Sequence, residues 1–216
     1  MSEFTVYKTK NAKENAEYYD NWAKKYDDDL GKCRYAGPRM LAQFVTSLVD
    51  DKSANILDFG AGTGILGVQL AQQGFESLDA HDGSEKMLEL AKEVGVYKNF
   101  YCELLEPGKQ MRVVPAEKYD VVVMIGCVAP GHLNTDHLPF LLHPLKKKGL
   151  VIMAIREIFL NYESVKNTAH ADWRYEVEET MKQMERNQQW KLLRRVKVPD
   201  YIFDDQAGVQ FAYQKL

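Results

Sequence analysis

A set of glycines directly after a short apolar segment carries the clearest chemical signal in this chain. The segment Ile56 to Phe59 is typical of a buried strand, and the glycines follow it at alternate positions: Gly60, Gly62 and Gly64. A helix is expected to begin near Ile65. Glycine lets backbone approach a ligand where a Cβ would collide, and the unpaired N–H groups of a helix start favour negative charge. The turn predicts a nucleoside-cofactor site that holds a carboxylate or phosphate.

The glycine spacing separates the possible cofactors. A dinucleotide site has the pattern Gly-x-Gly-x-x-Gly, but Ile65 stands where its third glycine would be. A phosphate-binding P-loop needs Lys and then Ser or Thr after the last glycine, and Ile65 and Leu66 occupy those positions. NAD and ATP or GTP are therefore disfavoured. With Asp58 at the strand end, the pattern is hydrophobic-Asp-x-Gly-x-Gly-x-Gly.

A second acidic residue follows the next predicted strand. Asp82 comes after the segment Ser77 to His81, about 20 residues beyond the glycine turn, the distance at which a βαβ unit brings a carboxylate to a ribose. Its two oxygens suit the two sugar hydroxyl donors. In the alternative interpretation, Asp82 caps the helix predicted from Ser84 to Glu93. Asp79, on the other face of the same strand, is the competing ribose ligand.

The pattern around Asp58 resembles the first motif of class I S-adenosylmethionine-dependent methyltransferases. The resemblance implies that S-adenosyl-L-methionine is the cofactor. It also implies cofactor contacts from the glycine turn, from the acid after the second strand, from the following helix and from the ends of the third and fourth strands. These positions are Asp58, Gly60, Ala61, Gly62, Asp82, Gly83, Met87, Glu103, Leu104 and Ile125. For Glu103, a solvated loop carboxylate is an equal alternative.

Aromatic residues mark a predicted helix near the N-terminus. Tyr19, Trp22 and Tyr26 share one helix face, which is also the usual pattern of an aromatic stripe packed on a core. The segment resembles the N-terminal lid of many small-molecule methyltransferases, which implies that Tyr19 and Tyr26 contact the methionine end of the cofactor, whereas Trp22 serves mainly in packing. From about residue 15 to 160, the order of segments is similar to the methyltransferase-like proteins named for the Williams–Beuren syndrome chromosome region.

The resemblance implies an in-line displacement, in which the protein mainly aligns donor and acceptor, so that a dedicated catalytic residue is not required. Three residues are candidates for the substrate pocket: Cys127, His132 and Arg156. His132 is the best-placed base, although a loop histidine is usually only a surface residue. Arg156 suits an anionic acceptor or, alternatively, an ordinary ion pair. His132 and His137 do not have a zinc spacing, so no metal is expected.

Composition limits the partners and the compartment. The chain has 216 residues, a formal net charge of −3 and no basic field for nucleic acid, and the run Lys146 to Lys148 is interpreted as a solvated helix end. The three cysteines, Cys33, Cys102 and Cys127, form no Cys-x-x-Cys pair, which indicates reduced thiols in the cytoplasm or nucleus. No apolar run suggests a signal peptide or a membrane span, so we expect a soluble protein. The acceptor, a small molecule or a protein, and the oligomeric state are not indicated.

The predicted elements form one α/β domain. Residues 1–12 are expected to be a flexible tail and residues 13–216 a single domain, with lid helices in 13–50 and the core in 54–216. Alternating elements predict a doubly wound, parallel sheet: strands near 54–59, 76–81, 98–102, 119–125 and 149–155, with helices near 64–73, 84–94 and 135–143. The lid begins with a helix to about Leu30 and a turn at Gly31, and Pro38 opens its second helix.

The C-terminal third completes the predicted fold. From Trp173 to Gln189 the apolar spacing predicts a core-facing helix, followed by strands at Lys191–Val198 and Val209–Leu216. The resemblance implies a mostly parallel, seven-stranded, Rossmann-like sheet whose last strand is antiparallel and lies between the fifth and sixth. Two other functions stay open: a non-catalytic S-adenosylmethionine-binding regulatory or activating subunit, and, less favoured, a nicotinamide oxidoreductase.

Overall fold

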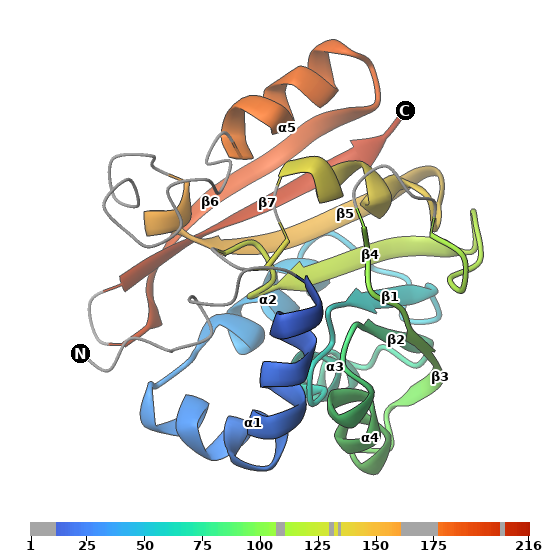
Figure 1. The fold of residues 1–216 in the computed structure, drawn as a ribbon. Coiled ribbons are helices and arrows are strands. Elements are labelled where there is room, and N and C mark those ends of the chain that lie inside the picture. The colour runs from blue at the N-terminus through green and yellow to red at the C-terminus, as the bar shows by residue number, and fades with distance from the viewer. Residues whose placement is uncertain (1–11, 107–110, 130–131, 134, 161–176, 204–205) are drawn as a thin grey trace.

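A computed structural model describes residues 12–106, 111–129, 132–133, 135–160, 177–203 and 206–216. The predicted tail lies outside the described residues apart from Ala12, as does the first part of the helix predicted from Trp173. A twisted sheet runs through the molecule, and α1 and α4 lie next to each other at one end of it (Figure 1).

The sheet has seven strands in the order β3-β2-β1-β4-β5-β7-β6. Their bounds are β1 Ile56–Phe59, β2 Leu78–Asp82, β3 Tyr97–Cys102, β4 Tyr119–Ile125, β5 Leu145–Arg156, β6 Trp190–Ile202 and β7 Gln206–Lys215. The pairs within β3-β2-β1-β4-β5 are parallel, and β7 pairs antiparallel with both β5 and β6. The predicted doubly wound sheet and its inserted antiparallel strand are confirmed.

Helices cover both faces of the sheet. Their bounds are α1 Ala12–Lys32, α2 Gly37–Thr46, α3 Ile65–Gln72, α4 Glu85–Glu93 and α5 Val177–Arg186, with 3-10 helices η2 Thr135–Leu142 and η3 Glu157–Phe159. Two predictions were wrong in detail. The segment near 135–143 is a 3-10 helix containing Pro139, because proline removes an amide donor and crowds the preceding turn. Helix α1 continues through Gly31, and the chain turns at Arg34, which has a φ of 50°.

The central strands bury both of their faces, as expected for parallel strands between two helical layers. Leu57, Val122 and Met153 point into the layer that contains η2 and α5, whereas Ile56, Val123 and Ile152 point into the layer that contains α2 and α3. The apolar strand residues thus alternate between two separate cores. This arrangement leaves the carboxyl ends of β1, β2 and β4 at one edge, where polar side chains gather.

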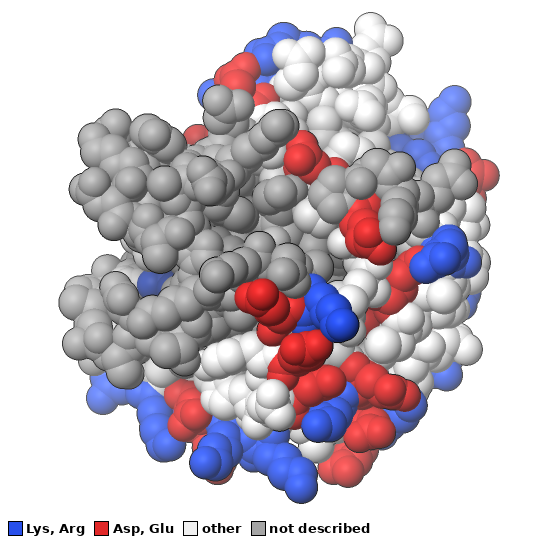
Figure 2. All heavy atoms as spheres, viewed as in Figure 1, with Lys and Arg blue, Asp and Glu red and all other residues white. Residues whose placement is uncertain are grey.

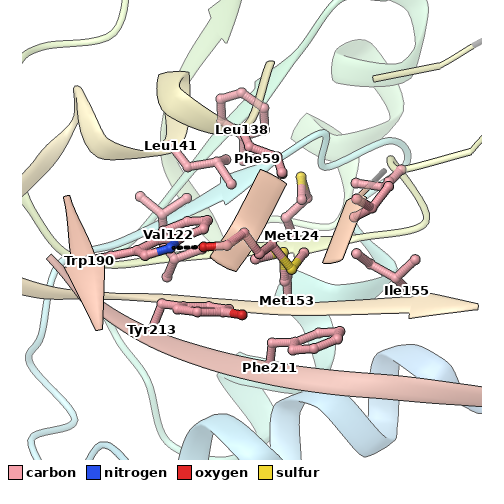
Figure 3. Packing of buried hydrophobic residues seen from close by; sticks show 14 of the residues in the cluster. Phe59, Val122, Met124, Leu138, Leu141, Met153, Ile155, Trp190, Phe211 and Tyr213 are labelled. Carbon is pink, nitrogen blue, oxygen red and sulfur yellow. Dashed lines mark hydrogen bonds between the residues drawn. The ribbon is translucent and has the colours of Figure 1, made fainter. Parts of the chain in front are cut away.

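Helix α5 faces the first of these cores, as its apolar spacing predicts. Val177, Met181 and Met184 are buried. Trp190, fully buried at the start of β6, donates from Nε1 to the carbonyl oxygen of Met181 at 3.0 Å and stacks on Tyr213 with ring centroids 4.3 Å apart (Figure 3). The methionines therefore pack against the sheet and do not form an exposed binding surface.

The basic run Lys146 to Lys148 is part of β5, so its interpretation as a helix end was wrong. The β4–β5 register shifts between the pairs Tyr119 with Leu145 and Val121 with Leu150, so the run forms a bulge, and Lys148 has a φ of 65°. Lys146 Nζ lies 2.7 Å from Asp120 Oδ1. On the face shown in Figure 2, acidic and basic side chains intermingle over the described surface. None of the described helices is long and apolar enough to span a bilayer.

Candidate functional site

The glycine turn after β1 has the backbone shape that its sequence predicts. Gly60, Gly62 and Gly64 have φ values of 76°, 56° and 94°, in the left-handed region that favours glycine. The amides of Gly60 and Ala61 donate to the carbonyl oxygen of His81 at 2.8 and 2.9 Å, which fixes the turn against β2. A Cβ on Gly60 would lie 2.2 Å from Cys127 Sγ. The turn is therefore shaped for close approach of the backbone to neighbouring groups.

Asp82, at the end of β2, faces this turn. Its Oδ2 accepts the N–H of Gly62 at 2.8 Å, and its Oδ1 accepts the N–H of Ser84 at 2.8 Å. Burial raises the pKa of Asp82, although these backbone N–H groups favour the charged carboxylate. The alternative in which Asp82 caps α4 was wrong, because Ser84 is the N-cap and accepts the N–H of Met87 at 3.1 Å.

Asp79 has a structural environment on the opposite face of β2. It is buried, and its carboxylate accepts Lys118 Nζ at 2.6 Å, the Tyr119 hydroxyl at 2.7 Å and Asn99 Nδ2 at 2.9 Å. The side chain does not line either cavity described below. Of the two carboxylates considered for ribose, only Asp82 is placed to meet a ligand.

Two other predicted cofactor residues support the turn from behind. Asp58 is buried beneath it and accepts the Tyr97 hydroxyl at 2.6 Å. Burial raises the pKa of Asp58 to about 7, with a smaller contribution in the same direction from Asp82, and the Tyr97 hydrogen bond opposes both. Ala61 packs in the core. Neither Asp58 nor Ala61 lines the cavity.

A cavity opens at the carboxyl ends of β1, β2 and β4, between the sheet and α1. The predicted residues that the structure brings to its wall are Tyr19, Tyr26, Gly60, Gly62, Asp82, Gly83, Met87, Glu103, Leu104, Ile125, Cys127 and His132. Sequence reasoning missed several of its lining residues, among them Phe59, His81, Ser84, Leu105, Gly126 and His137. Phe59, His81 and Gly126 are direct neighbours of predicted positions in the sequence. Their place at the ends of predicted strands is the signal that could have identified them.

Helix α1 covers the cavity and is held by hydrogen bonds at separate points, so we call it the lid helix. The Tyr19 hydroxyl lies 2.7 Å from His132 Nε2. Asp20 accepts the Ser84 hydroxyl at 2.6 Å, and Asp27 accepts the Thr63 hydroxyl at 2.6 Å. Tyr26 belongs to the lid helix itself and lines the cavity, and burial raises its pKa. The lid is thus joined to the glycine turn, to α4 and to the loop after β4.

Glu103 makes hydrogen bonds to backbone N–H groups at this end of the cavity. Its side chain is 6% exposed, and its two oxygens accept the N–H groups of Arg112 and Val113 at 3.0 to 3.2 Å. These hydrogen bonds hold its pKa below the usual range despite burial. The interpretation as a solvated loop carboxylate was therefore wrong, and the carboxylate instead holds the backbone at Arg112 and Val113.

A second cavity adjoins the first. Tyr19, Tyr26, Gly126 and His132 line both. The second cavity has further aromatic walls and one guanidinium, supplied by Trp22, Tyr35, Phe159, Tyr201 and Arg156. Arg156 donates to the side-chain oxygen of Gln206, and its guanidinium carbon lies 4.9 Å from the centre of the Phe159 ring. Cys127 lines only the first cavity, where burial raises the pKa of its thiol.

Metal ligands do not gather among the described residues: no group of three or more His, Cys, Asp or Glu side chains there is arranged to hold a metal ion. The described cysteines Cys33, Cys102 and Cys127 are free thiols. Instead, the first cavity combines a glycine turn, a partly buried carboxylate and apolar walls. This donor set fits a nucleoside with a charged tail, because it offers hydroxyl acceptors, backbone N–H groups and room for a flat base.

Comparisons with known proteins agree with this chemistry. Residues 56–147 match the methyltransferase domain family. Human methyltransferase-like protein 27 is 30% identical over 177 residues, which are 81% of this chain and 67% of that protein. Among solved structures, an S-adenosylmethionine-dependent methyltransferase of Leishmania major has a TM-score of 0.68 at 17% identity over 94% of this chain and 82% of its own. The [4+2]-cyclase SpnF also has a TM-score of 0.68, at 12% identity over 96% and 97%.

The sheet order and the glycine turn define a Rossmann-like protein that binds a nucleoside cofactor. Given the family match and the human relative, this chain belongs to the class I S-adenosylmethionine-dependent methyltransferases. S-Adenosyl-L-methionine is therefore its cofactor, as the glycine motif predicts.

Proposed function

We propose that this protein is an enzyme that transfers a methyl group from S-adenosylmethionine to a small-molecule or protein acceptor by in-line displacement. The observation that carries the proposal is the shared wall of the two cavities at Tyr19, Tyr26, Gly126 and His132. A donor in the first cavity and an acceptor in the second would meet there. When bound, the cofactor supplies an activated methyl group on a sulfonium, so the protein's main task is alignment.

The cofactor-binding roles follow from the first cavity. Asp82 would accept the ribose hydroxyls, and the glycine turn with the start of α3 would hold the methionine carboxylate. Met87 and Leu104 would flank the base, beside Gly83. Ile125, Tyr19 and Tyr26 would lie toward the methionine end. Asp58 and Ala61 would act only through the turn, since their side chains do not reach the cavity.

The second cavity would hold the acceptor. Its rings favour an apolar or aromatic acceptor, and Arg156 disfavours an ammonium and favours a carboxylate or uncharged group. No aspartate or glutamate lines it among the described residues. His132 is placed to receive a proton from an acceptor hydroxyl, thiol or amine, with Tyr19 fixing its ring through their hydrogen bond.

We also propose a relationship that is closer than membership of the broad family. The 30% identity to the human methyltransferase-like protein supports a closer kinship with the proteins named for the Williams–Beuren syndrome chromosome region. We further propose that residues 13–216 act as one domain. We also propose that the acceptor is not a nucleic acid and that the protein works in the cytoplasm or nucleus; the mixed surface charge supports the first of these two points.

The test is release of S-adenosylhomocysteine during incubation with S-adenosylmethionine and a panel of aromatic acids, phenols, thiols, amines and protein extracts. We expect release with at least one aromatic acid or phenol, and loss of it in Arg156→Met with cofactor affinity unchanged. S-Adenosylhomocysteine, but not NADH, should raise the melting temperature, since only a ligand of the native state stabilises it. A melting temperature that responds to NADH alone would refute the proposal.

One observation keeps open a second candidate, a non-catalytic subunit in which the fold binds S-adenosylmethionine without transferring its methyl group. SpnF shares the fold over nearly all of this chain and is described as a cyclase, so the fold by itself does not imply methyl transfer. Binding of S-adenosylhomocysteine without turnover across the acceptor panel would favour this candidate over the enzyme.

A further inference from the structure

His81 is a buried imidazole in the wall of the cofactor cavity. It is the fourth residue of β2, is 3% exposed and lines the cavity. Its ring stacks on Phe59, with centroids 4.7 Å apart and planes 23° apart, so the ring orientation is fixed. Neither Nδ1 nor Nε2 makes a hydrogen bond of good geometry among the described residues, although the backbone carbonyl of Glu103 lies near the ring. A buried polar group in this state destabilises the protein, and a ligand that pairs with it would remove that cost.

The imidazole is uncharged at neutral pH. Burial lowers the pKa of His81 to about 4, and the nearby carboxylate and backbone carbonyl of Glu103 oppose this shift only in part. A neutral imidazole has one N–H donor and one acceptor nitrogen. It suits an uncharged polar partner better than the carboxylate or ammonium at the methionine end of the cofactor.

The residues around His81 suit a flat ring with polar atoms at its edge. Phe59 and Leu105 line the cavity beside it, and Met87 and Leu104 belong to the same cavity wall. Asp82 follows it in the chain but points to the other side of the strand and faces the glycine turn. Glu103, one of the predicted cofactor residues, already accepts backbone N–H groups at both oxygens. His81 is the buried polar side chain here that keeps its hydrogen-bonding groups unused.

We propose that His81 is a specificity-determining residue that makes a hydrogen bond to the adenine base of the cofactor. The inference rests on the proposed position of the ribose at Asp82, which directs the base toward the apolar wall around His81. Of the uncharged parts of the cofactor, the adenine edges offer both ring-nitrogen acceptors and an amino donor. A neutral imidazole can pair with either kind of atom. Selectivity arises because a base without the matching atom leaves the buried imidazole unpaired.

The test compares S-adenosylhomocysteine with its 1-deaza, 3-deaza, 7-deaza and N6,N6-dimethyl analogues, by calorimetry at pH 7.5. We expect the wild-type protein to bind at least one analogue about 3- to 10-fold more weakly than the parent, the effect of one hydrogen bond. In His81→Phe, which keeps a ring to stack on Phe59, that analogue and the parent should bind equally. His81→Leu provides a second variant in case the larger ring disturbs folding.

Two control variants separate the effect of His81 from general effects on cofactor binding. His143→Phe changes a histidine that does not line the cavity and should retain the wild-type preference. Asp82→Asn should weaken all of the ligands by the same factor. The inference is overturned if the wild-type protein does not discriminate among the analogues, or if both His81 variants keep its preference. Failure of wild-type protein to bind S-adenosylhomocysteine at all would instead refute the proposed function, and this inference with it.

Discussion

The hydroxyl of Tyr19 on the lid helix lies 2.7 Å from Nε2 of His132, 113 positions later in the chain. The two rings also meet edge to face, with centroids 5.5 Å apart. Both residues line both cavities. This contact therefore joins the cover of the cofactor cavity to the wall of the proposed acceptor cavity, at the position where donor and acceptor would have to be aligned.

The first prediction concerns this contact. Tyr19→Phe keeps the ring but removes the hydroxyl, so the lid helix should open more readily and cofactor dissociation should become about 3- to 10-fold faster, the effect of one hydrogen bond. Stopped-flow measurement of S-adenosylhomocysteine release gives the rate. In a double-mutant cycle with His132→Phe, the two changes should couple by about 1 kcal/mol. Strictly additive effects would show that the contact does not hold the lid.

The second prediction concerns Asp82. Asp82→Ala should weaken cofactor binding by about 1–3 kcal/mol, because the ribose hydroxyls lose a charged acceptor. Calorimetry on the folded variant measures the loss. Asp79→Asn is the matched control: this carboxylate binds Lys118 and Tyr119 outside the cavity, so its loss should lower the melting temperature but not the affinity. An unchanged affinity in Asp82→Ala would place the ribose elsewhere.

The third prediction concerns the glycine turn. Gly60→Ala combines a φ of 76° with a Cβ placed 2.2 Å from Cys127 Sγ, so it should destabilise the protein and abolish cofactor binding. Gly62→Ala adds a Cβ with no atom within 4 Å and should cost only the backbone strain, about 1–2 kcal/mol. Urea unfolding gives both values. Adding Cys127→Ala should recover part of the stability of Gly60→Ala, and the clash is not the cause if it recovers none.

The fourth prediction concerns the pH dependence of stability. The folded-state pKa of Asp58 is about 7, and the unfolded value is about 3.9, so the folded state keeps a proton that the unfolded state has lost. The stability that this retained proton contributes is fully present below about pH 4 and disappears as the pH rises through 7. Between pH 5 and pH 8, the unfolding free energy of Asp58→Asn should therefore rise by about 2–3 kcal/mol relative to that of the wild-type protein. Parallel curves of unfolding free energy against pH would contradict the raised pKa.

Local patterns in the sequence were sufficient for most of the fold. The continuous apolar run of β4, the glycine turn after β1 and the apolar spacing of α5 each reflect interactions between near neighbours, and each is confirmed. One error lies where a distant contact competes with the local pattern. Lys146 to Lys148 have the composition of a helix end, yet pairing with β4 draws them into a bulged strand.

The candidate site was likewise predicted in part from local patterns and decided in part by the tertiary structure. The sequence alone indicated the turn and the acid that faces it, because a backbone shape that only glycine adopts easily leaves a local pattern, and the cofactor followed from the resemblance of that pattern to a known family. Only the tertiary structure decided that Asp58 lies behind the turn, that Glu103 is occupied by the backbone of Arg112 and Val113, and that His81 lines the cavity without a hydrogen bond of good geometry. The partners of a buried polar group come from distant segments of the chain, so its role depends on contacts that no local pattern contains.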